Sequence, residues 1–158
     1  MRRFIFFLII VSFSGTVWAA DPIIGTWELN INKSIIPVSE HDIKLKSETI
    51  ICREMEGGWI ETTINTINTD GSNNLKEWIF PKEGGILRTI SGQIPKKMIS
   101  VATLVNPGHY YLTITANGRQ VNLYHFIVSK DGKSMKGTLT GLDKEGNPQN
   151  ITWFFEKK

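Results

Sequence analysis

The sequence predicts an all-β fold, an antiparallel up-and-down meander of about 8–10 strands that closes or nearly closes into a barrel. Turn-forming pairs such as Asp70-Gly71 and Asn117-Gly118 recur at near-regular spacing, and such pairs favour tight hairpins. The segments between them are rich in Ile, Thr, Val and aromatic residues, which suit a pleated, half-buried surface. No segment keeps apolar residues at helical spacing over several turns. A two-sheet sandwich is the second choice.

The first expected strand, residues 23–31, alternates most clearly. Its presumed inner face carries Ile23, Gly25, Trp27, Leu29 and Ile31. Because successive side chains of a strand point to opposite faces, we expect Trp27 to point into the barrel. Residues 33–46 are the best helix candidate, but Pro37 interrupts them, so a loop or one short turn is expected there.

The later strands follow the turn signals in order. They are expected at residues 46–56, 59–68, 75–81, 86–92, 98–105, 109–116, 119–128, 134–142 and 149–156. A further turn is expected at residues 93–97, because Pro95 cannot donate to a central ladder. The short links favour pairing between sequential strands, and a sheet of about ten strands tends to curl and close, which removes its exposed edges.

Residues 1–20 read as a signal peptide. Arg2 and Arg3 form a positive start, residues 4–11 are an unbroken apolar run, and small residues close the segment at Ala19-Ala20. The run is shorter than the ~20 residues that a membrane-spanning helix needs, and nothing later in the chain could span a bilayer as a helix. We therefore expect a periplasmic or secreted protein whose mature N-terminus is Ala20 or Asp21, with residues 21–158 as a single domain.

Charge and cysteine content narrow the function classes. The 158-residue chain has a formal charge of +3, which falls to +1 without residues 1–20, since these carry two arginines and no acidic residue. A nearly neutral domain gives no electrostatic basis for binding nucleic acid. Cys52 is the only cysteine, so no intramolecular disulfide can form. A buried, inert thiol is its simplest interpretation.

Two stretches carry a family resemblance. The expected mature chain opens with Gly25-Thr26-Trp27 inside GTWELN, and residues 128–135 read VSKDGKSM, ahead of a final WFFEKK. A Gly-x-Trp on the first strand is shared by lipocalins and related calycin barrels, and the arrangement resembles bacterial exported lipocalin-like (calycin-type) proteins of uncharacterised function. The resemblance implies a lipocalin-like barrel and no established reaction. In lipocalins this Trp packs under a basic side chain from near the chain end, for which Lys157 and Lys158 are the candidates.

No motif in the sequence points to catalysis or to a metal. His41, His109 and His125 lie on separate segments and there is one cysteine, so the spacing of a zinc site is missing. There is no Gly-x-Ser-x-Gly elbow for a nucleophile. We therefore expect no metal, no cofactor and no enzymatic activity.

The aromatic residues suggest the function. As core residues they need no further role, but a cavity lined by them, with a few polar anchors, would suit a small apolar ligand. The candidate ligand-binding residues are Trp27, Arg53, Trp78, Arg88 and Tyr124. The two arginines could be polar anchors, although an outward-facing arginine is the commoner case. The first hypothesis is thus a binding barrel for a small hydrophobic or amphipathic molecule. The alternatives are an envelope protein-interaction module with a solid core, and a small hydrolase or isomerase on the same scaffold.

Overall fold

The computed structural model describes residues 20–37, 44–91, 98–143 and 145–158. These residues form one antiparallel sheet of 11 strands, which confirms the all-β prediction. The strands are β1 (Gly25–Leu29), β2 (Leu45–Met55), β3 (Trp59–Asn68), β4 (Asn73–Pro81), β5 (Gly85–Ile86), β6 (Arg88–Ser91), β7 (Met98–Asn106), β8 (His109–Ala116), β9 (Arg119–Val128), β10 (Ser134–Leu142) and β11 (Pro148–Lys157), with a short 3-10 helix, η1 (Ile31–Lys33). The described residues contain no helix long and apolar enough to cross a membrane. Apart from Ala20, the predicted signal peptide lies outside them.

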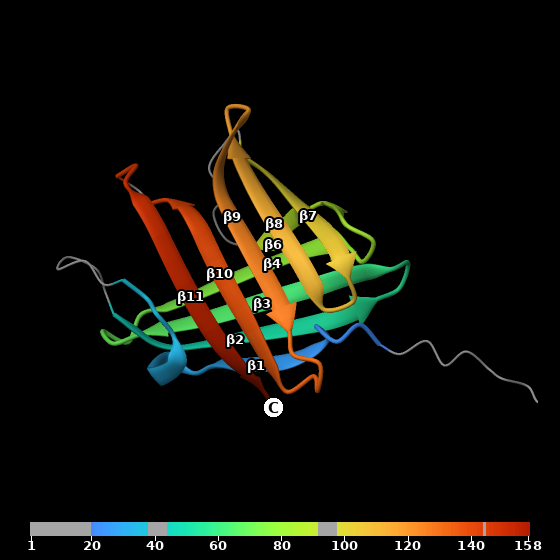
Figure 1. Cartoon of the computed structure of the whole chain (residues 1–158), viewed down its shortest axis with the longest axis horizontal. Coiled ribbons are helices and arrows are strands. Elements are labelled where there is room, and N and C mark those ends of the chain that lie inside the picture. Colours follow the sequence, from blue (N-terminus) through green and yellow to red (C-terminus); the bar gives the residue numbers. More distant parts are fainter. Residues whose placement is uncertain (1–19, 38–43, 92–97, 144) are drawn as a thin grey trace, which may run out of the picture.

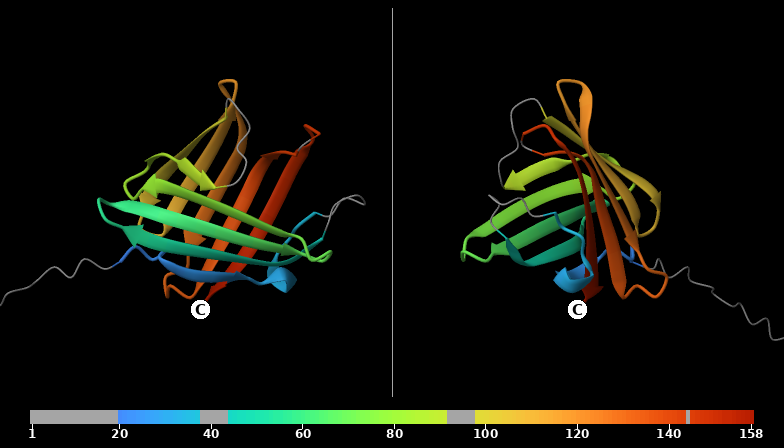
Figure 2. Two further views of the ribbon diagram at one scale, coloured as in Figure 1. Left: turned by 180° about the vertical axis from the view of Figure 1, so that it is seen from behind. Right: turned by 60° about the vertical axis from the view of Figure 1, so that its left-hand side comes forward.

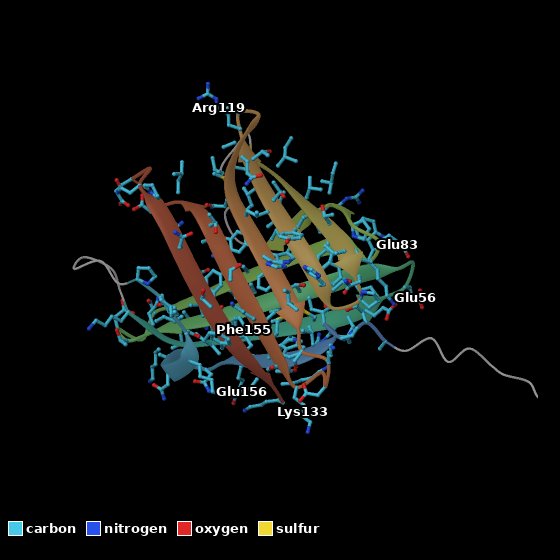
Figure 3. The ribbon with its side chains drawn as sticks, in the orientation of Figure 1. Glu56, Glu83, Arg119, Lys133, Phe155 and Glu156 are labelled. Atoms are coloured by element: carbon cyan, nitrogen blue, oxygen red, sulfur yellow. The ribbon has the colours of Figure 1, made fainter. Side chains whose placement is uncertain are left out.

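Most strands pair with their neighbours in sequence, as a meander requires. The order in the sheet is β5-β7-β8-β9-β10-β11-β1-β2-β3-β4-β6. β1 joins the two ends of the chain, because Trp27 lies opposite Ile50 of β2 on one side and opposite Lys157 of β11 on the other. Figure 1 shows β7–β11 crossing in front of β1–β4, and Figure 2 shows the same two layers from behind and from the side. Figure 3 adds the side chains in the orientation of Figure 1. The sheet is a nearly closed barrel, as predicted.

The two edges of the sheet are formed by one segment that changes its partner. The sequence predicts one strand over residues 86–92, but the structure divides it at Leu87. Before this residue β5 pairs with β7, and the Leu87 N–H donates to the Ser100 carbonyl oxygen at 2.9 Å. After it β6 pairs with β4 instead. Among the described residues β6 and β7 share no ladder, so the barrel is incomplete there; the turn expected at 93–97 lies outside the described residues.

The first strand ends earlier than the sequence predicts. β1 stops at Leu29, and Ile31 lies in η1 with 41% of its surface exposed instead of facing the interior. The side-chain oxygen of Asn30 accepts a hydrogen bond from the Lys33 N–H at 3.2 Å. Such local side-chain bonds compete with a strand ladder for the backbone, which explains why the alternation does not continue. The short helix η1 overlaps the candidate segment 33–46 only at Lys33, and residues 38–43 of that segment lie outside the described residues.

Trp27 is fully buried, as its position in the alternation predicts. Its indole N–H donates to the Ile23 carbonyl oxygen at 2.7 Å. Of the two candidate lysines it is Lys157 that covers the ring, with its Nζ 5.0 Å from the ring centre. Gly25 makes this possible: a Cβ there would lie 2.5 Å from the Lys157 Cε, and its φ of 142° is one that other residues rarely adopt.

The Asp21 side chain links the start of the domain to Gly108 and to β8 in the opposite layer. Its buried carboxylate accepts hydrogen bonds from the Ile23 N–H at 2.9 Å, the Gly108 N–H at 3.1 Å and the Tyr110 hydroxyl at 2.7 Å. Burial, and then the bond to Asp21, raise the pKa of Tyr110 far above its ordinary value, so the phenol stays protonated and remains the donor. No motif in the sequence points to this role for Asp21.

Candidate functional site

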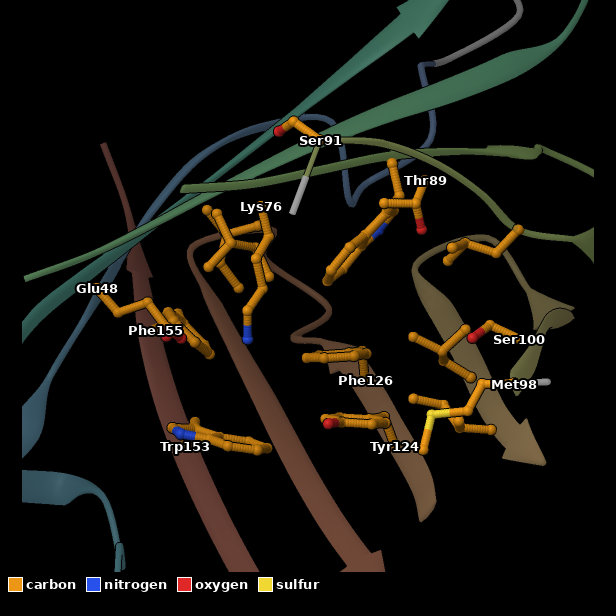
Figure 4. A pocket seen from close by; sticks show the side chains of 16 residues that line it. Glu48, Lys76, Thr89, Ser91, Met98, Ser100, Tyr124, Phe126, Trp153 and Phe155 are labelled. Carbon is orange, nitrogen blue, oxygen red and sulfur yellow. The ribbon is translucent and has the colours of Figure 1, made fainter. Parts of the chain in front are cut away.

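A cavity of about 260 Å³ lies between the two layers of the barrel. Figure 4 shows the side chains that surround it. They come from inward-facing positions of strands in both layers, and they are Glu48, Ile50, Ile64, Lys76, Trp78, Leu87, Thr89, Ser91, Met98, Ser100, Leu112, Ile114, Tyr124, Phe126, Trp153 and Phe155. Most are aliphatic or aromatic, so the cavity is mainly apolar with a small polar portion.

One wall of the cavity is a row of parallel rings. Tyr124 is stacked with Phe126 at a centroid distance of 6.3 Å and with Trp153 at 6.2 Å, and the ring planes differ by 8° and 7°. Gly137 of β10 lies opposite both Phe126 and Trp153 in the ladders. A Cβ on Gly137 would lie 2.9 Å from the Phe126 ring. A glycine is therefore required at position 137, because any larger residue would collide with the Phe126 ring in its present position.

The other wall carries polar groups. Lys76, Thr89 and Ser91 project from β4 and β6, and Figure 4 shows them across the cavity from Tyr124 and Trp153. The hydroxyl oxygens of Thr89 and Ser91 are buried and have no hydrogen-bond partner among the described residues. An unpaired buried polar group costs free energy and is uncommon in proteins. Two such groups on one side of a cavity are therefore sites at which a bound molecule could form hydrogen bonds.

Glu48 is the acidic group of the cavity. It accepts a hydrogen bond from the Thr66 hydroxyl at 3.0 Å. Burial raises the pKa of Glu48, although the Thr66 bond and the positive charge of Lys76 oppose the shift. The neutral form of Glu48 is thus more favoured than in a free glutamate, and Lys76 supplies the positive charge among the side chains that line the cavity.

A smaller apolar space of about 50 Å³ adjoins the main cavity and is lined in part by the same side chains. Cys52 faces this space and is buried. Burial raises the pKa of the Cys52 thiol to about 12. Since the thiolate is the nucleophilic form, this cysteine is the inert thiol that sequence analysis favoured.

The structure places the five candidate ligand-binding residues differently. Trp78 and Tyr124 line the cavity. Trp27 does not, because it is packed in the core under Lys157. Arg53 and Arg88 do not line the cavity either. The Arg53 side chain is 67% exposed and lies 3.9 Å from the Glu61 carboxylate, and the Arg88 guanidinium lies over the Trp59 ring at 5.1 Å.

Strand alternation accounts for the positions of the two arginines and of the polar residues that line the cavity. Arg53 follows the inward-facing Cys52, and Arg88 follows the inward-facing Leu87, so both arginines point outward. By the same rule Lys76 shares a face with Trp78, while Thr89 and Ser91 share a face with Leu87. The alternation in the sequence therefore indicates the polar wall. Lys76 lies two positions before Trp78, and Thr89 and Ser91 lie two and four positions after Leu87.

Folding also brings two histidines together on the outside of the barrel. The Nε2 atoms of His109 and His125 are 2.6 Å apart. Burial, and then the neighbouring charges of His109 and Lys136, lower the pKa of His125. Within the part of the chain that the structure describes, there is no group of three or more His, Cys, Asp or Glu side chains placed to hold a metal ion.

Comparison with known proteins shows a fold likeness. The chain matches no protein-family model and no curated protein sequence. Among solved structures it is similar to the wild-type fluorescent protein UnaG, with 14% identity and a TM-score of 0.56, over 86% of this chain and 97% of that one. Two single-residue variants of UnaG match at 12% and 13% identity, with TM-scores of 0.57 and 0.59, over 87% of this chain and 96% of theirs. The likeness shows that the two proteins share a barrel fold.

Proposed function

We propose that this protein is a non-catalytic carrier that binds one small, mainly hydrophobic molecule in the barrel cavity. The observation that carries the proposal is the cavity of about 260 Å³ between an aromatic wall and a wall with unpaired hydroxyls. Its volume is near the lower end of small-molecule pockets, which span roughly 300–1,000 Å³. A ligand of two or three rings, or of similar bulk, suits it.

The polar wall gives the ligand an orientation. The flat apolar part lies against Tyr124 and Trp153, and a polar or anionic group lies toward Lys76, Thr89 and Ser91. Lysine attracts an anion, and the two hydroxyls can donate to it. This arrangement supports an amphipathic ligand over a purely apolar one.

The two alternative functions have weaker support. An interaction module with a solid core would not need an apolar cavity that ends in unpaired hydroxyls. A hydrolase would need an activated nucleophile, whereas Cys52 is protonated and His125 pairs with His109 on the face opposite the cavity.

A matched pair of dyes tests the binding proposal. Anilinonaphthalene sulfonate and phenylnaphthylamine share one aromatic skeleton, but only the first carries an anionic group. We expect both to bind with one site per chain in a fluorescence titration, the anionic dye more tightly. Lys76→Met should weaken the anionic dye by about tenfold, the equivalent of roughly 1.4 kcal/mol, and leave the neutral dye unchanged.

Lys136→Met is the matched control for the dye experiment. Lys136 is exposed on the outer face, with its Nζ 5.9 Å from the Phe154 ring, so its removal should leave both dyes unaffected. If neither dye binds, the carrier proposal fails. If both dyes bind but Lys76→Met and Lys136→Met behave alike, the polar wall has no role in orienting the ligand.

We also propose that the carrier acts outside the cytoplasm. The charged and apolar pattern of residues 1–20 supports this, and so does the anchoring of Asp21, because a cut on either side of Ala20 leaves every hydrogen bond of the Asp21 carboxylate intact. Sequencing the N-terminus of protein from fractionated cells should find Ala20 or Asp21 in the periplasm or medium. Protein with an intact Met1 recovered from the cytoplasm would contradict the proposal.

A further inference from the structure

The outer surface of the barrel carries a histidine pair that the ligand cavity does not use. Leu112 of β8, and Tyr124 and Phe126 of β9, line the main cavity. By alternation His109 and His125 therefore face outward, and the Tyr111 ring lies stacked on His125. Tyr111 lies opposite His125 of β9, and His109 lies opposite Ile127. The two histidines therefore occupy a diagonal position across neighbouring strands, where side chains can still meet. Both are half-buried, and their Nε2 atoms are 2.6 Å apart.

The chemistry of imidazole gives this pair two states. A neutral imidazole carries its proton on one ring nitrogen and a lone pair on the other. If one Nε2 is protonated, the two rings share a hydrogen bond. If both rings carry the proton on Nδ1, two lone pairs point at the same place, which is the arrangement that a metal ion needs from two nitrogen ligands.

The surroundings hold the rings in place. The Tyr111 ring is stacked on His125 at a centroid distance of 4.2 Å, with an angle of 10° between the planes. The centroids of the Tyr111 and His109 rings are 5.6 Å apart. Lys136, on the next strand, has its Nζ 5.9 Å from the centre of the Phe154 ring, and its charge still acts on His125. The site therefore has two oriented nitrogens with one lysine charge near them.

We propose that His109 and His125 together form a surface site for a divalent transition-metal ion such as Zn²⁺. Zinc–nitrogen bonds of about 2.0–2.1 Å in tetrahedral geometry place two ligand nitrogens about 3.3 Å apart. To admit the ion, the two Nε2 atoms must move apart by about 0.7 Å from their present contact, and the rings must turn so that both lone pairs point to the metal. Among the described residues no third His, Cys, Asp or Glu side chain joins the pair, so the proposed site has two protein ligands and water in the remaining positions. Mg²⁺ and Ca²⁺, which prefer oxygen ligands, should not bind.

Calorimetric titration of the purified, untagged protein with ZnCl₂ tests this site. We expect one Zn²⁺ per chain and no heat of binding with MgCl₂. His109→Gln and His125→Gln should each weaken Zn²⁺ binding at least tenfold, and the double variant should be little worse than either single one, because one histidine alone cannot chelate. His41→Gln, which removes the third histidine of the chain, is the matched control and should bind like the unaltered protein. Far-ultraviolet circular dichroism verifies that each variant is folded.

A second measurement uses the chemical reactivity of the same atoms. Diethyl pyrocarbonate modifies accessible imidazole nitrogens, and mass spectrometry locates the modified residues. Zn²⁺ should protect His109 and His125 together and leave the reactivity of His41 unchanged. The proposal is overturned if Zn²⁺ does not bind, if the double variant binds it as well as the unaltered protein, or if Zn²⁺ protects neither residue of the pair.

Discussion

Replacing Trp27 with alanine is expected to lower the free energy of unfolding by about 3–5 kcal/mol, the range for emptying a large aromatic site in a core. Trp27 is one of the largest fully buried side chains of the barrel. The substitution removes its packing against the core, its hydrogen bond to the Ile23 carbonyl and its contact with Lys157. Equilibrium urea unfolding followed by circular dichroism measures the loss.

Two further substitutions separate the contributions at this site. Trp27→Phe keeps a ring but loses the N–H, so it should cost less than the alanine variant. Lys157→Met removes the charge above the ring and should cost about 0.5–1 kcal/mol, as expected for a cation–π contact of an exposed lysine. Thr26→Ala, one position earlier and on the opposite face, is the control and should be nearly neutral. A Trp27→Ala variant as stable as Thr26→Ala would show that this ring does not support the barrel.

Replacing Asp21 with alanine is expected to cost about 2–4 kcal/mol of unfolding free energy. The change leaves the Tyr110 hydroxyl and the Gly108 N–H without the acceptor that they share. Each buried donor left unpaired costs about 1–3 kcal/mol. Part of this loss is offset, since the variant no longer buries a carboxylate. Urea unfolding again provides the measurement.

A double-mutant cycle identifies the partner of Asp21. Tyr110→Phe should be destabilising by itself, and the double variant should cost less than the sum of the two single changes, because both remove the same hydrogen bond. Asp131→Ala is the matched control. Asp131 also accepts two turn hydrogen bonds, from Ser129 and Lys133, but it is exposed, so its removal should cost about 1 kcal/mol or less. Strictly additive effects of Asp21→Ala and Tyr110→Phe would contradict the structural link.

The unpaired hydroxyls of Thr89 and Ser91 lie at one edge of the sheet. They lie on β6, the part of the chain that pairs with β4 after the partner change at Leu87. The barrel is incomplete beside them, because β6 and β7 share no ladder among the described residues. The polar wall of the cavity thus forms where the sheet is least complete.

Local sequence determined the strands and their faces. Turn pairs such as Asn117-Gly118 set the limits of neighbouring strands, and two-residue alternation placed Trp27 in the core, because both depend only on residues close in the chain. The same alternation, applied consistently, would have turned Arg53 and Arg88 outward and Lys76 inward. Those assignments were accessible without a structure.

The tertiary structure alone decided which distant groups meet. Asp21 and Tyr110 are separated by 89 residues, and His109 and His125 by 16, on strands whose register is fixed only when they pair. The partner change at Leu87 depends on how β4 and β7 are placed on either side of it, and the cavity depends on how far the closed sheet holds its two layers apart. Strand formation responds to local alternation and turn chemistry, whereas contacts and cavities respond to the closure of the whole sheet, which no local segment of the sequence encodes.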